Sequence, residues 1–215
     1  MRSPLLTLPL LALLGGVAPA AEIDPGQQQN ALMLLLNGLP GSANESTMSP
    51  KIAVVVAGMD VTLETTTLGE IAAKLGGEIN TAGESENSFA WMCYASPDVT
   101  TGGTTLTWFY GNDTNQMLLT GIAVEFAPDE LPAGCVRVEK PIGVTTGLPG
   151  LGAPVADLDG VFGKATADSG IPGTVSYMFG STRMGDGYVF RNEAKYVLGD
   201  THVLAFSFRT VVEEE

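Results

Sequence analysis

The stretch TLGEIAAKLGG, residues 67–77, carries a complete set of signals for one short helix. Thr67 and Glu70 have the spacing of a capping box, in which each side chain accepts a hydrogen bond from the backbone of the first turn. Gly76-Gly77 is typical of a helix C-terminus, because glycine adopts the left-handed conformation found there. The apolar residues recur at the spacing of one helix face and are Leu68, Ile71, Ala72 and Leu75. This helix needs a second element to cover its apolar face.

A second stretch, PVADLDGVFG at residues 154–163, repeats the order of these signals. Pro154 stands near the first helical position, where the missing N–H of proline costs nothing. Gly163 is typical of the helix C-terminus. The apolar residues between them are Val155, Leu158, Val161 and Phe162. The chain therefore encodes the same short helix twice.

Each helix is followed by three segments with the composition of β-strands. The first set is FAWMCYA (89–95), TTLTWFY (104–110) and MLLTGIAVEF (117–126), and the second is TVSYMFG (174–180), EAKYVLG (193–199) and THVLAFSFRTVV (201–212). Turn-forming residues separate the strands, and Gly199-Asp200 predicts a tight hairpin. We expect an α+β fold of two tandem modules, residues 51–140 and 141–215, each a helix followed by a three-stranded antiparallel meander.

The first 20 residues have the pattern of a Sec-type signal peptide. Arg2 precedes an apolar run over residues 5–17, and Ala18-Pro19-Ala20 is a typical cleavage sequence. The run is shorter than the roughly 20 residues of a spanning helix. We expect cleavage near Ala20, a periplasmic or secreted protein, and no membrane insertion.

Residues 21–50 are predicted to form an N-terminal helix and a linker. Asp24-Pro25 has the pattern of a helix start, and the apolar residues 31–36 favour a helix that packs on the core, with a lipid-facing patch as the alternative. The segment IAVVVAGMDVTLE (52–64) then predicts a strand, bent at Gly58 and added to the first sheet.

The charges and the cysteines limit the partners and the compartment. The net charge is −14, so the chain would repel nucleic acid and anionic lipid surfaces. Only Cys93 and Cys135 are present, and in an exported chain two cysteines predict one structural disulfide. Such a bridge would stabilise the fold by roughly 4 kcal/mol.

The repeated helix and meander resemble the tandem modules of secreted β-lactamase inhibitor proteins, and more loosely those of small outer-membrane-assembly lipoproteins. The segments that carry the resemblance are TLGEIAAKLGG with TWFYGN and LTGIAVEF, and PVADLDGVFGK with VSYMF and HVLAFSF. The acylated cysteine of the lipoproteins is absent, and only the first copy holds cysteines. The resemblance implies an exported protein that acts by binding another macromolecule.

No catalytic constellation is evident in the sequence. The only histidine, His202, is predicted in mid-strand on an apolar face, as a structural residue. No serine or cysteine has an evident base partner, and no cofactor motif or transition-metal ligand set occurs. DLDG (157–160) matches part of a calcium-binding loop but lacks the other ligands. We expect no cofactor and no metal.

Six aromatic residues on the predicted strands are the candidate binding residues, because large amphipathic rings anchor protein interfaces. They are Trp91, Tyr94, Trp108, Tyr110, Tyr177 and Tyr196. The alternative is that these rings belong to the core, which is the commoner role of aromatic residues on strands. The sequence favours a non-catalytic protein-binding module of the inhibitor, immunity or envelope-assembly type, with another exported or envelope protein as its partner. The alternative is a periplasmic hydrolase that uses an Asp/Glu pair.

Overall fold

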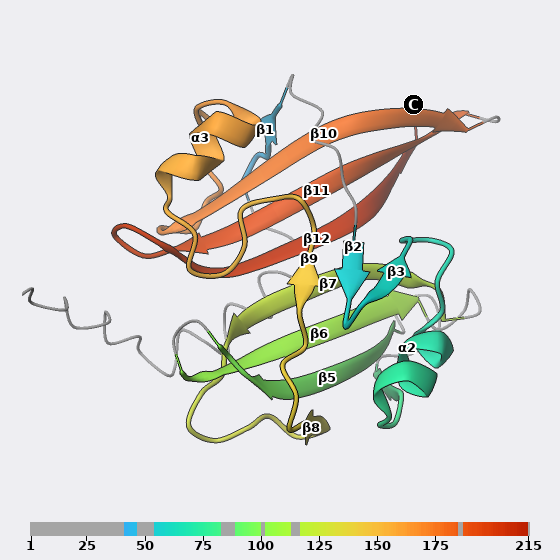
Figure 1. The fold of residues 1–215 in the computed structure, drawn as a ribbon. Helices are drawn as coiled ribbons and strands as arrows, with labels where there is room; N and C mark the ends of the chain where they lie inside the picture. The colour runs from blue at the N-terminus through green and yellow to red at the C-terminus, as the bar shows by residue number, and fades with distance from the viewer. Residues whose placement is uncertain are drawn as a thin grey trace, which may run out of the picture.

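The computed structural model describes residues 41–46, 54–82, 89–99, 102–112, 117–184 and 187–214 (Figure 1). The predicted signal peptide, the helix predicted after Asp24-Pro25 and the apolar stretch 31–36 lie outside these residues. Neither of the two helices in the described part has the length and hydropathy of a membrane-spanning helix.

The α+β class expected from the sequence is wrong, because strands make up most of the described structure and only two helices are among the described residues. The large sheet contains β1 (Asn44–Glu45), β4 (Asn80–Ala82), β5 (Phe89–Pro97), β6 (Thr104–Asn112), β7 (Leu119–Phe126), β8 (Cys135–Arg137), β10 (Thr174–Met184), β11 (Tyr188–Leu198) and β12 (Val203–Glu214). Its order is β1-β10-β11-β12-β7-β6-β5-β4, and β8 also pairs with β5. The pairs β1–β10 and β5–β8 are parallel and the others are antiparallel, so the sheet is mixed.

The expected division into two helix-plus-meander modules is wrong. The strands on both sides of residue 140 form one continuous sheet of nine strands, joined where Ala205–Arg209 of β12 pair with residues 121–125 of β7. Each meander alone would leave an edge of unpaired backbone groups, and this long-range pairing satisfies them. Local sequence patterns predict hairpins and do not specify which edges meet.

A second, smaller sheet replaces the single strand predicted over residues 52–64. It contains β2 (Val54–Val56), β3 (Met59–Val61) and β9 (Val144–Thr145) in the order β3-β2-β9. Ala57 and Gly58, with φ of 48° and 78°, form the two-residue turn between β2 and β3. Positive φ at both positions suits the twist of a tight hairpin. The bend expected at Gly58 is therefore a full reversal, and this segment does not join the large sheet.

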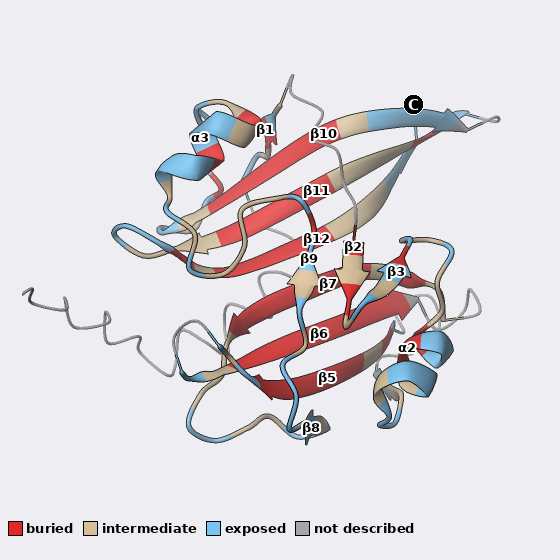
Figure 2. Cartoon of the chain, viewed as in Figure 1, coloured by how far each residue is buried: buried red, intermediate tan, exposed pale blue. Residues whose placement is uncertain are grey.

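The front face of the large sheet carries the main core. Here α2 (Leu68–Leu75), α3 (Ala156–Phe162) and the small sheet pack against apolar residues of β5–β7 and β10–β12 in one continuous cluster. Figure 1 shows the small sheet between the two halves of the large one, and Figure 2 shows the buried residues along the middle of its strands. The ring of Phe162 stacks on Tyr177 with centroids 4.4 Å apart.

The two helices begin differently. At α2 the Thr67 Oγ1 accepts from the backbone N–H of Glu70, and the Glu70 carboxylate accepts from the N–H of Thr67, which confirms the predicted capping box. At α3 no side chain caps the first turn, and Pro154 precedes the helix in a bridge to His202. Both helices end at a glycine with positive φ, as the sequence predicted.

Candidate functional site

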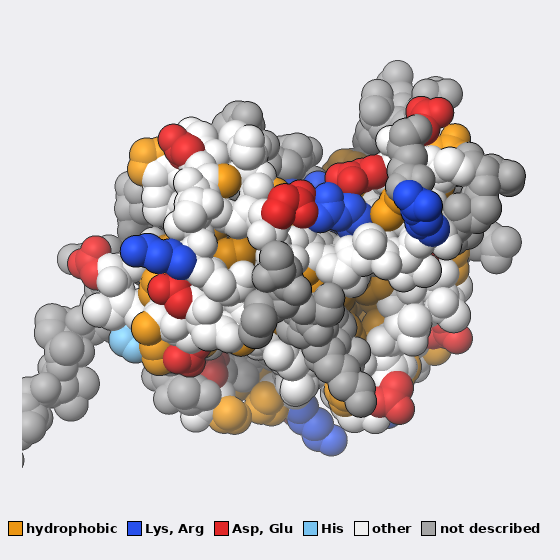
Figure 3. All heavy atoms as spheres, turned by 90° about the horizontal axis from the view of Figure 1, so that it is seen from above, with side chains coloured by type: hydrophobic (Ala, Val, Ile, Leu, Met, Phe, Trp, Pro, Cys, Tyr) orange, Lys and Arg blue, Asp and Glu red, His pale blue; other side chains and the backbone are white. Residues whose placement is uncertain are grey.

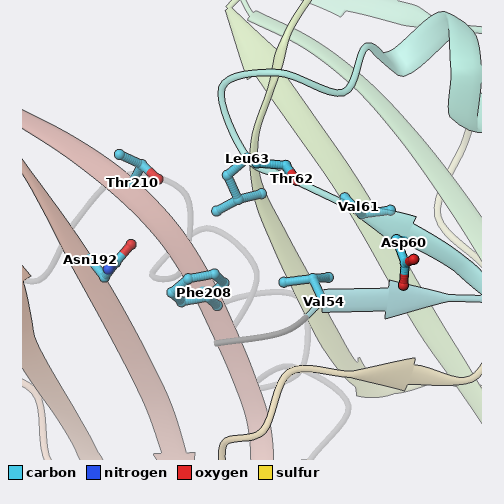
Figure 4. A pocket seen from close by; sticks show the side chains of 8 residues that line it. All are labelled: Val54, Asp60, Val61, Thr62, Leu63, Asn192, Phe208 and Thr210. Carbon is cyan, nitrogen blue, oxygen red and sulfur yellow. The ribbon is translucent and has the colours of Figure 1, made fainter. Parts of the chain in front are cut away.

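A cleft lies between the small sheet and the end of β11 and β12 (Figure 4). Its volume is about 400 Å³. The lining residues are Val54, Asp60, Val61, Thr62 and Leu63 on one side and Asn192, Phe208 and Thr210 on the other. Figure 4 shows these two groups facing each other across the opening. The cleft thus combines an apolar floor with a carboxylate, an amide and two hydroxyl groups.

Three neighbouring strand ends begin at the cleft and lead away from it, and we call them the ribbon end: residues 180–184 of β10, 188–192 of β11 and 210–214 of β12. Phe190 pairs with Val212, and Asn192 pairs with Thr210. Because alternate residues of a strand share a face, Phe190 and Val212 continue the surface that lines the cleft. Val212 is 53% exposed. The cleft and the ribbon end therefore form one surface with exposed apolar side chains.

The chemistry available in the cleft is limited. Asp60 is the single acid among the described residues that line it, and hydrolysis by paired carboxylates requires two. In two other hollows, of about 330 and 690 Å³, the described lining residues include one acid each, Asp98 and Glu139. In the described part of the chain, no three His, Cys, Asp or Glu side chains gather as metal ligands.

The rear face of the large sheet, opposite the helices, buries a charged cluster. The Glu193 carboxylate lies 2.5 Å from Arg209 Nε and 3.1 Å from Lys195 Nζ, and it accepts a hydrogen bond from Ser176 Oγ. Burial disfavours the charged form of Glu193, but the positive charges of Lys195 and Arg209 outweigh it and lower its pKa. Burial, reinforced by Arg209, lowers the pKa of Lys195. One carboxylate therefore lies between two cationic side chains and pairs with both, which suits a structural cluster.

Glu125 is a second buried acid on the rear face, and it has no cationic partner among the described residues. Its Oε1 accepts a hydrogen bond of 2.9 Å from Trp108 Nε1, while no described residue bonds to its Oε2. Burial raises the pKa of Glu125 to about 7, although the Trp108 hydrogen bond lowers it in part. This carboxyl group therefore changes charge near neutral pH.

No family profile, curated protein sequence or solved structure matches this chain. Its own residues are the basis for any functional assignment.

The six aromatic residues proposed from the sequence do not line the cleft. Five are buried, namely Tyr94, Trp108, Tyr110, Tyr177 and Tyr196, and Trp91 is half-buried against Trp108. The Tyr94 hydroxyl donates to the carbonyl of Gly76 at the end of α2, and desolvation raises the pKa of Tyr94 to about 12. A ring enclosed in this way supports the fold, whereas Trp91 keeps part of its surface exposed.

The remaining sequence-based expectations have mixed outcomes. Cys93 and Cys135 form the predicted disulfide, with Cα atoms 4.4 Å apart on the neighbouring strands β5 and β8. His202 is exposed in the β11–β12 turn beside Thr201, so its predicted place in mid-strand on an apolar face is wrong. Asp157 and Asp159, of the sequence DLDG, lie in the first turn of α3.

Sequence reasoning missed both the cleft and the rear-face acids. The cleft depends on the small sheet, whose separate existence no local pattern indicated. For the rear face a signal was present: in NEAKYVL (192–198) the residues Glu193 and Lys195 alternate with Ala194 and Tyr196, so both charges point to one face.

Proposed function

We propose that this protein is an exported, non-catalytic binding protein, and that it binds a partner protein through the cleft and the ribbon end. The observation that carries the proposal is the exposed apolar side chain of Val212, next to an open cleft and on the same face of the sheet. Tyr188, which is 46% exposed, lies farther out on the same ribbon end. Tyrosine is one of the residues that most often anchor protein interfaces.

Two further features support this function. The Cys93–Cys135 disulfide agrees with an oxidising compartment, as expected from the N-terminal sequence. Among the described residues, each of these three hollows is lined by one acid and not by a pair, which favours binding over hydrolysis.

Affinity capture with variants at two exposed valines tests the proposal. The purified chain serves as bait for an envelope extract of its native cell, and the retained proteins are identified by mass spectrometry. Val212→Asp places a charge on the proposed surface, whereas Val99→Asp places one at Val99, which is 80% exposed and lies after β5. We expect the wild type and Val99→Asp to retain the same protein, and Val212→Asp to retain at least tenfold less of it.

Circular dichroism must show that both variants are folded. Equal capture by folded Val212→Asp would contradict the proposed surface. Turnover of a glycan or peptide substrate by the purified chain would replace binding by the hydrolase alternative.

A further inference from the structure

Beyond Arg209, no described strand pairs with the side of β12 that faces β7. On this side β12 pairs with β7 only through Ala205–Arg209, while its pairing with β11 continues to Glu214. No described residue pairs with the β7-facing side of residues 210–214. Alternate residues of this segment therefore present backbone N–H and C=O groups in a row, which is the template that an added strand recognises.

The cleft lies beside the start of this edge. Thr210 belongs to both, since it lines the cleft and is the first residue beyond the pairing with β7. In a strand laid along the edge, side chains would alternate between the two faces of the sheet. Half of them would point to the front face, on which Thr210 and Asn192 line the cleft. The edge would bind the backbone of such a strand, and the cleft would accept a side chain near Thr210.

The charges around the edge determine which strand it suits. Glu213 and Glu214 lie at its outer end, and Asp60 lies in the cleft. Of the cations nearby, Arg191 is engaged by Glu45 and Glu213, and Arg209 is engaged by Glu193. Figure 3 shows acidic and basic side chains side by side on the face seen from above, with hydrophobic side chains in small groups. A basic segment complements this edge, whereas a second copy of a chain with net charge −14 would be repelled.

We infer that β12 binds an extended, basic segment of a partner protein by strand addition along Thr210–Glu214. This inference rests on the proposed function and names the chemistry of the partner. Backbone hydrogen bonds supply part of the affinity, and the acidic residues select lysine and arginine side chains over acidic ones.

A synthetic peptide of alternating valine and lysine, six residues long with blocked ends, is a defined probe. Its binding to the full chain is measured by fluorescence anisotropy at low salt. Two control peptides separate the contributions: one carries glutamate in place of lysine, and the other is N-methylated at every internal residue, which removes its N–H donors. We expect both controls to bind at least tenfold more weakly.

Amide hydrogen exchange locates the bound peptide. Alternate amides within residues 210–214 should exchange at least tenfold more slowly when the peptide is saturating, because they gain a partner. Asn80–Ala82 of β4, which also has an outer edge, is the internal control and should not change.

Three results would overturn the inference: protection at β4 instead of β12, equal binding of the acidic or the N-methylated peptide, or pairing of two copies along this edge in sedimentation experiments. None of these results would contradict the capture experiment or the proposed function that it tests. If Val212→Asp loses the partner while the peptide protects no amide of β12, the partner binds through side chains alone. If folded Val212→Asp retains as much of the partner as the wild type does, the proposed function is contradicted, whatever the peptide shows.

Discussion

On the front face of the large sheet, rings such as Tyr177 and Phe206 pack beneath the helices and the small sheet, whereas on the rear face Glu125, Glu193 and Lys195 are buried. Both faces are built from the same strands by alternate residues. The front face depends on apolar contacts, which pH does not alter. The rear face depends on a covalent bridge at Cys93 and on ionisable groups, so its contribution should vary with redox conditions and pH.

Removal of the disulfide should have the largest effect, and it acts on the rear face. The bridge closes a loop with a sequence separation of 42, for which the chain-entropy relation gives about 4 kcal/mol. The double substitution Cys93→Ala and Cys135→Ala should lower the free energy of unfolding by that amount in urea titrations. The wild type in reductant is the control and should behave alike. Equal stability with and without the bridge would contradict this assignment.

Loss of one front-face ring should have the next largest effect. Phe162 is buried and lies against Tyr177, Phe179 and Tyr196. We expect Phe162→Ala to cost about 3 kcal/mol in urea unfolding at every pH, because it removes apolar contacts and leaves a cavity. Asp157→Ala, at an exposed position of the same helix, should change little. If the loss of unfolding free energy in Phe162→Ala varied strongly with pH, the proposed difference between the two faces would be contradicted.

Glu125 should make the rear face sensitive to pH. Its pKa is raised in the folded chain from 4.5 to about 7, so folding favours the protonated carboxyl group. Stability from this group is therefore complete below pH 4.5 and is lost as pH rises through 7. The loss of unfolding free energy between pH 4.5 and pH 8 from this group is at most about 3 kcal/mol. We expect about 2 kcal/mol, because water can partly solvate the ionised form.

The substitution Glu125→Gln isolates this effect, because the amide oxygen can still accept from Trp108. The variant should be the more stable protein at pH 8 in urea titrations, and its advantage should disappear by pH 4.5. Glu130→Gln, at an exposed position after β7, is the control and should follow the wild type. Parallel curves for all three proteins would show that Glu125 is solvated.

The smallest effect should come from a change that belongs to neither face. Thr67→Ala removes the side-chain acceptor of the capping box at the start of α2, which costs about 1 kcal/mol. The backbone and side-chain hydrogen bonds from Thr67 lower the pKa of Glu70, so an NMR titration of Glu70 should show its pKa rising in the variant. Thr65→Ala, at an exposed position just before the cap, is the control.

The sequence predicted the parts of this fold that depend on local chemistry. The capping box of Thr67 and Glu70, both glycine helix stops and the six long strands are present because capping, turn residues and alternation act over a few positions. The pairing of β7 with β12 joins segments far apart in the chain, and no local signal specifies it. Five of the six candidate rings are buried, and the sequence could not show this because the exposed face of a strand depends on what packs against it.

β12 follows β11 in the chain but lies between β11 and β7 in space. The last strand of the described chain therefore joins the two halves of the large sheet. The hairpins of each half form between segments that are close in the sequence, whereas residues 121–125 pair with the distant residues 205–209. Contacts of such long sequence separation form slowly because loop closure costs entropy. Until they form, β7 and β12 each expose an unpaired edge that another chain can capture. Refolding yield should therefore fall as protein concentration rises, with losses to aggregates that grow from the unjoined halves.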